Sequence, residues 1–77
     1  MVKNKVKKID FKEVDTNEAD TTYYLYKQYR VSKRVAAYSE AARKYYTAWS
    51  VKNTQTLKCY VVTSFDEAIE MINEGDL

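Results

Sequence analysis

The length of the chain limits its fold more than any single motif does. A chain of 77 residues forms one domain, and folding buries only about 60% of the surface that the unfolded chain exposes. Such a domain has one small hydrophobic core and little room for a deep substrate pocket. We therefore expect one compact domain over residues 21–77, preceded by a charged, partly ordered lead-in over residues 1–20.

The composition and the N-terminal residues indicate a folded protein in a reducing compartment. Apolar residues make up 45% of the chain, and eight residues are tyrosines, which is untypical of disordered proteins. The lysine-rich start does not resemble a signal peptide, and no segment approaches the roughly 18 apolar residues of a membrane span. The single cysteine, Cys59, cannot form an intramolecular disulfide. We expect a soluble, cytoplasmic protein with no membrane partner.

Several common chemistries lack the residues they need. The chain has no histidine, which excludes Ser-His-Asp and Cys-His mechanisms and ordinary zinc sites. Its one glycine, Gly75, lies near the C-terminus and cannot form a glycine-rich phosphate loop. Asp66, Glu70 and Glu74 repeat at four-residue steps, which is typical of a solvated helix face. We expect no enzymatic activity, no catalytic residue, no metal and no cofactor.

Charge is segregated along the chain although the net charge is only +2. Residues 1–12 carry a net charge of +4 and residues 13–20 a net charge of −4. Residues 21–64 carry +7, and residues 65–77 carry −5. All eight tyrosines and the one tryptophan fall in the basic segment, 21–64. A basic, aromatic middle between acidic segments is the most unusual property of this sequence.

Residues 21–31 are rich in tyrosine and β-branched side chains, which predicts a strand. Alternation along one continuous strand divides these residues between two faces. Leucine and valine share one of the faces, so we expect it to point inward. The inward set is Tyr23, Leu25, Tyr29 and Val31, and the outward set is Tyr24, Tyr26, Gln28 and Arg30.

Two patterns compete in residues 33–46. Apolar side chains repeat there at helical spacing, and alanine favours a helix. The alternation of Tyr45, Thr47, Trp49 and Val51 is instead typical of a strand. We predict a helix over residues 33–46 and a strand over 47–53.

The C-terminal part is more definite. Residues 49–51 and 57–63 flank the polar, turn-like cluster of residues 53–56, which predicts a hairpin. Ser64 and Glu67 then form a capping-box pattern at the start of a helix, and Gly75 supplies its left-handed stop. The expected fold is α+β, a small antiparallel sheet of about three strands in β-α-β-β-α order, packed by the C-terminal helix and a second helix. A four-stranded meander with one helix is the alternative.

The basic, tyrosine-rich segment suggests a non-catalytic binding module for nucleic acid, because cations neutralise phosphates and aromatic rings stack on bases. The same residue types are enriched in protein interfaces, so a protein-protein interaction module is the alternative, as an accessory regulator or inhibitor of a larger protein. A competing interpretation is that the tyrosines mostly fill the core, because leucine, isoleucine and phenylalanine are few. The candidate partner-binding residues are Tyr24, Tyr26, Arg30, Lys33, Arg34, Arg43 and Lys44.

Overall fold

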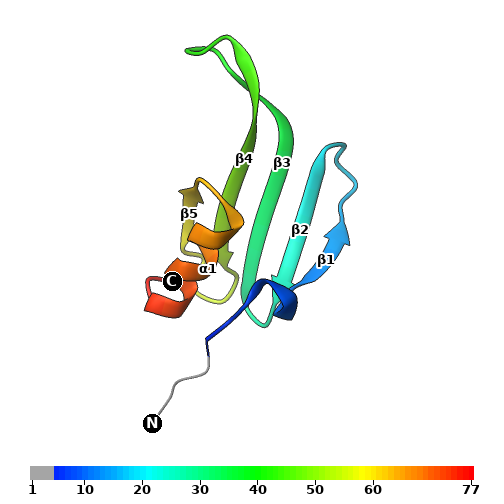
Figure 1. Cartoon of the computed structure of the whole chain (residues 1–77). Helices are drawn as coiled ribbons and strands as arrows, with labels where there is room; N and C mark the ends of the chain where they lie inside the picture. The colour runs from blue at the N-terminus through cyan, green and yellow to red at the C-terminus, as the bar shows by residue number, and fades with distance from the viewer. Residues whose placement is uncertain (1–4) are drawn as a thin grey trace.

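The structure, a computed structural model, describes residues 5–77. Within that part of the chain, five antiparallel strands form one sheet in which each strand pairs with its neighbours in sequence (Figure 1). A single α-helix lies against one face of the sheet. The α+β class is confirmed; the expected three strands and two helices are wrong, and the alternative meander has one strand too few. The elements are η1 (Lys8–Asp10), β1 (Lys12–Asp15), β2 (Thr21–Tyr26), β3 (Tyr29–Ser39), β4 (Lys44–Asn53), β5 (Cys59–Val62) and α1 (Phe65–Glu74).

The segment expected to be helical, residues 33–46, is a β-hairpin formed by the outer parts of β3 and β4. Val31 and Val51 stand opposite each other and are fully buried, so they fix the register of these two strands. Pairing then continues outward from the buried valines. Ala36 adopts a left-handed conformation (φ 64°), and Ala42 lies in the turn. Tertiary pairing therefore overrides the helix propensity of the alanines.

The hairpin expected from the polar cluster after residue 53 is confirmed, with β4 and β5 as its strands. The buried side chain of Asn53 organises the turn. Its Oδ1 accepts hydrogen bonds from the amides of Gln55 (2.9 Å) and Thr56 (3.2 Å), and its Nδ2 donates to the carbonyl of Leu77 (3.2 Å). A buried amide that makes all three bonds joins this turn to the C-terminus.

The C-terminal helix starts and ends where the sequence predicts. Ser64 is the N-cap of α1, and its hydroxyl accepts a hydrogen bond from the Glu67 amide at 3.1 Å. The Glu67 carboxylate accepts from the hydroxyl of Thr63. Gly75 ends the helix in the left-handed conformation, with φ 79°.

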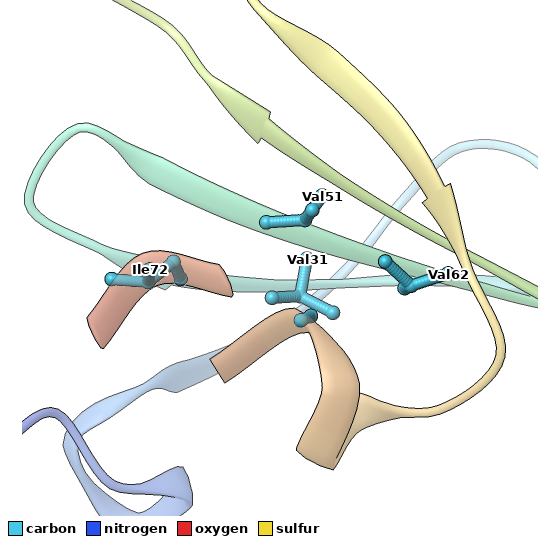
Figure 2. Close-up of a cluster of buried hydrophobic side chains, with 5 residues drawn as sticks. Val31, Val51, Val62 and Ile72 are labelled. Atoms are coloured by element: carbon cyan, nitrogen blue, oxygen red, sulfur yellow. The ribbon is translucent and has the colours of Figure 1, made fainter. Parts of the chain in front are cut away.

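The core lies between α1 and the three last strands. Figure 2 shows Val31, Val51 and Val62, one from each of β3, β4 and β5, directed toward Ile72 of α1. Ala68, also buried, completes the cluster. The small side chain of Ala68 allows the helix to approach the valines of the strands closely.

Aromatic rings extend this core toward the first strands. Phe65, the first residue of α1, lies with its ring centroid 4.7 Å from that of Tyr24, 5.4 Å from Phe11 and 5.7 Å from Trp49. The Tyr24 and Trp49 rings are themselves stacked, with centroids 6.3 Å apart. Several aromatic residues therefore do serve as core in this small domain.

The outward orientation expected for Tyr24 and Tyr26 is wrong. A two-residue turn at residues 27–28 divides the expected strand into β2 and β3. Tyr24 pairs with Val31 across this hairpin, and paired residues lie on the same face of a sheet. Burial of Val31 therefore brings Tyr24 and Tyr26 to the α1 side and places Tyr23 on the opposite one.

Residues 5–20, most of the expected lead-in, contribute η1 and the edge strand β1. Val6 and Asn73 exchange two hydrogen bonds: the Val6 amide donates to Oδ1 of Asn73 (2.8 Å), and Nδ2 of Asn73 donates to the Val6 carbonyl (3.1 Å). This contact fastens the N-terminal segment to the last turn of α1. The other residues of that lead-in, 1–4, lie outside the described part of the chain.

Candidate functional site

The face of the sheet opposite α1 has no covering element within residues 5–77. Since Tyr24, Val31 and Val51 stand in register on the α1 side, their neighbours along each strand point to the other side. We call this other side the open face. Its strand positions are Lys12, Val14, Thr21, Tyr23, Leu25, Arg30, Ser32, Arg34, Ala48, Ser50, Lys52, Cys59 and Val61.

The open face is positively charged. Its strand positions carry Lys12, Arg30, Arg34 and Lys52, and none of those in the described part of the chain carries an acid. The ion pair found within residues 5–77, Lys8 with Asp66 at 3.1 Å, involves none of these four cations. The sheet thus separates charge between its faces, and the basic one lacks internal neutralisation.

Arg30 and Lys52 are directly opposite on β3 and β4. Like charges in such a pair destabilise a sheet, because the side chains lie within about 5 Å of each other. Arg30 also stacks on the ring of Tyr23, with its Cζ 4.6 Å from the ring centroid. The Nε of Arg30 is buried and has no hydrogen-bond partner in the structure. The centre of the open face therefore holds concentrated positive charge, which an anionic ligand would neutralise.

The predicted site residues do not form one surface. Arg30 and Arg34 lie on the open face. Lys33 lies on the α1 side, where its Nζ is 5.7 Å from the centroid of the Trp49 ring. The remaining four divide between the α1 side, with Tyr24 and Tyr26, and the far end of the β3–β4 hairpin, with Arg43 and Lys44.

The environment of Tyr24 is that of a packed side chain. Burial raises the pKa of Tyr24 above its ordinary value of 10.0, and the neighbouring Glu13 carboxylate raises it further. Its ring contacts Phe65 and Trp49 rather than open solvent alone. A stacking role for this ring would require displacement of α1.

Sequence reasoning missed Tyr23, Lys12 and Lys52, which the structure places with Arg30 on the open face. The missing information was the turn at residues 27–28, which contains neither glycine nor proline. Lys27 adopts the left-handed conformation there, with φ 51°. Once the strand is divided at this turn, its alternation assigns every open-face position of β2 and β3 correctly.

A cleft of about 410 Å³ lies beside the loop between β1 and β2. Asp15, Glu18, Asp20 and Lys33 contribute to its lining. Within residues 5–77, no three histidine, cysteine or acidic side chains are grouped so as to hold a metal ion. The cleft is therefore a polar hollow at one edge of the sheet, distinct from the basic open face.

Among residues 5–77, the structure contains no helix with the length and apolar character needed to cross a membrane. Comparison with protein-family models, with curated protein sequences and with solved structures finds no match to this chain.

Proposed function

We propose that this chain is a non-catalytic binding module that binds nucleic acid through the open face. The observation that carries the proposal is the set of four cations on that face, which within residues 5–77 have no acid among its strand positions and no ion-pair partner. Cations arranged in this way can each neutralise a phosphate and release its counterion. The proposal moves the site from the predicted tyrosines, Tyr24 and Tyr26, to their neighbours on the other side of the sheet.

The side chains between the cations suit the same ligand. Ser32 and Ser50 are paired in the row of β3 and β4 next to Arg30 and Lys52, and their hydroxyls can donate to phosphate oxygens. Tyr23 and its stacked arginine supply flat surfaces against which a base or sugar can pack. The open face thus offers contacts for a phosphate backbone first and for bases second.

An interaction with a protein is the second candidate, in which the chain acts as an accessory regulator or inhibitor of a larger protein. It is favoured by β5, an edge strand whose Val61 is 87% exposed beside the half-exposed Tyr60. An unpaired edge can add a strand from another chain. The lysines of the open face argue for nucleic acid there, because lysine is depleted in protein interfaces.

The test is a titration of labelled single-stranded DNA, followed by fluorescence anisotropy at several salt concentrations. The double variant Arg34→Gln, Lys52→Gln removes two cations from the open face, and Lys27→Gln, Lys58→Gln removes two exposed cations from turns. Both variants change the net charge equally. We expect the open-face variant to bind about tenfold more weakly or worse, with a salt dependence shallower by about 1.4 in its logarithmic slope.

The turn variant should stay within about twofold of the unmodified chain, since its cations lie away from the proposed contact. Equal losses in both variants would show that only net charge matters. Absence of salt-dependent binding by the unmodified chain would transfer the assignment to the protein partner.

A further inference from the structure

The outer part of the β3–β4 hairpin, residues 35–47, projects beyond the rest of the sheet, and we call it the arm (Figure 1). On this side of the sheet, pairing with β2 stops at its first residue, Thr21, opposite Arg34. Pairing with β5 stops at its last residue, Val62, opposite Trp49. Beyond these points β3 and β4 pair only with each other. The arm is therefore a two-stranded ribbon whose outer edges have no strand partner within residues 5–77.

The arm is built to hold its shape although it has no core of its own. The rings of Tyr38 and Tyr45, paired across the two strands, meet edge to face with centroids 5.1 Å apart. At its end, the hydroxyl of Ser39 accepts a hydrogen bond from the Ala42 amide at 3.2 Å. A bulge between Arg34 and the following strand residues marks its base, where local twist increases.

Its exposed chemistry continues that of the open face. Tyr46 is 48% exposed and shares its side of β4 with the open-face residues Ala48 and Ser50. Arg43 and Lys44 are exposed at the end of the arm. Glu40 is the one acid in residues 35–47, so the arm is positive as well. Basic and aromatic side chains therefore occur on the arm as well as on the open face.

From this geometry we propose that the arm inserts into the major groove of B-form DNA while the open face contacts the phosphate backbone. The inference rests on the proposed function and narrows the ligand from nucleic acid in general to duplex DNA. A two-stranded ribbon fits a major groove, which is about 12 Å wide and about 8.5 Å deep. The five residues of β3 in the arm, 35–39, extend about 15 Å, which is enough to reach the groove floor.

Duplex RNA should be a poor ligand for the arm. The major groove of an A-form helix is too narrow and deep for side chains to read, so a ribbon cannot enter it. Single-stranded DNA has no groove and would bind only to the open face. Of duplex DNA, duplex RNA and single-stranded DNA, only duplex DNA should therefore bind through the arm.

The experiment compares the chain with the double variant Arg43→Asn, Lys44→Gln. Asparagine is chosen because it tolerates the left-handed conformation of Arg43, with φ 53°. Binding is measured to one DNA sequence as a duplex and as a single strand, and to the corresponding duplex RNA. A further DNA duplex carries bulky groups at C5 of its pyrimidines, which fill the major groove. The open-face variant Arg34→Gln, Lys52→Gln serves as the comparison.

We expect the arm variant to lose about tenfold or more in affinity for duplex DNA and to bind the single strand within about twofold of the unmodified chain. The unmodified chain should bind the groove-filled duplex and duplex RNA about as weakly as the arm variant binds duplex DNA. Equal losses on both DNA forms, or none on either, would refute groove insertion while leaving the open face in place. If the open-face variant also changes nothing, the proposed function itself fails together with groove insertion.

Discussion

Replacing Tyr23 and Tyr24 separately by alanine tests the assignment of the two faces of the sheet. The two residues are adjacent in β2, yet the structure places Tyr24 against α1 and Tyr23 on the open face. A single-residue error in register would exchange their environments. The pair therefore forms its own matched control.

The expected magnitudes follow from the contacts. Removing a fully buried aromatic ring costs about 3–5 kcal/mol. Tyr24 is only partly buried, but its ring stacks on Trp49 and packs at a tilt against Phe65, so we expect a loss of about 2–3 kcal/mol in unfolding free energy. Tyr23 contributes mainly its contact with Arg30, so its removal should cost about 1 kcal/mol or less.

The assay is thermal unfolding followed by circular dichroism, supported by urea titration. For a domain of this size, 1 kcal/mol shifts Tm by about 4–8 °C. Tyr24→Ala should therefore lower Tm by about 10–20 °C, whereas Tyr23→Ala should lower it by less than about 8 °C. Tyr24→Phe, which retains the ring, should stay close to the unmodified chain.

A larger loss of stability in Tyr23→Ala than in Tyr24→Ala would place Tyr24 on the open face, and the described register would then be wrong. Similar small losses in both would mean that the aromatic cluster around Phe65 contributes little. A chain of this length has roughly 4–12 kcal/mol of total stability, so the larger expected loss remains measurable.

Two further predictions concern α1 and the pH response. Ser64→Ala should lower the unfolding free energy by about 0.5–2 kcal/mol in urea titrations, because the Glu67 amide loses its acceptor. Ser64→Asp should retain most of the stability, and an alanine variant of unchanged stability would show that the cap contributes nothing. The pKa of Tyr24 is raised in the folded chain, so the unfolded chain loses the Tyr24 hydroxyl proton first as pH rises. The contribution of this proton to folding stability is therefore complete below the ordinary pKa of 10.0, and it is lost as pH rises through the pKa of the folded state. Urea titrations above about pH 10 should show a steeper fall for the unmodified chain than for Tyr24→Phe, and parallel curves would contradict this.

Sequence reasoning succeeded where local signals and tertiary structure agree. Ser64, the apolar spacing of Ala68 and Ile72, and Gly75 specify α1 without reference to the rest of the chain. The β4–β5 hairpin is likewise indicated by the polar residues that follow Asn53. These elements carry their own start and stop signals.

Sequence reasoning failed where the structure is decided by pairing between strands. Ala36 and Ala42 favour a helix locally, and only the pairing of Val31 with Val51 shows that their segment is extended. The faces of β2 depend on a turn at Lys27, a residue that carries no turn signal. Because Arg30 follows that turn with unchanged alternation, it was placed outward correctly, whereas Tyr24 and Tyr26 before the turn were reversed.

The two hydrogen bonds between Val6 and Asn73 join the two ends of the described chain, so we expect them to form late in folding. Each strand of the sheet reaches its partner through a short connection, so sheet formation requires little loop-closure entropy. Val6 and Asn73 are separated by 67 positions, and their contact gains its full value only after the strands and α1 have brought them together. It should form late in folding and open early under stress. Loss of the two Val6–Asn73 hydrogen bonds would release η1 and expose the edge of Phe65. Local unfolding should therefore begin on the side of the sheet opposite the open face.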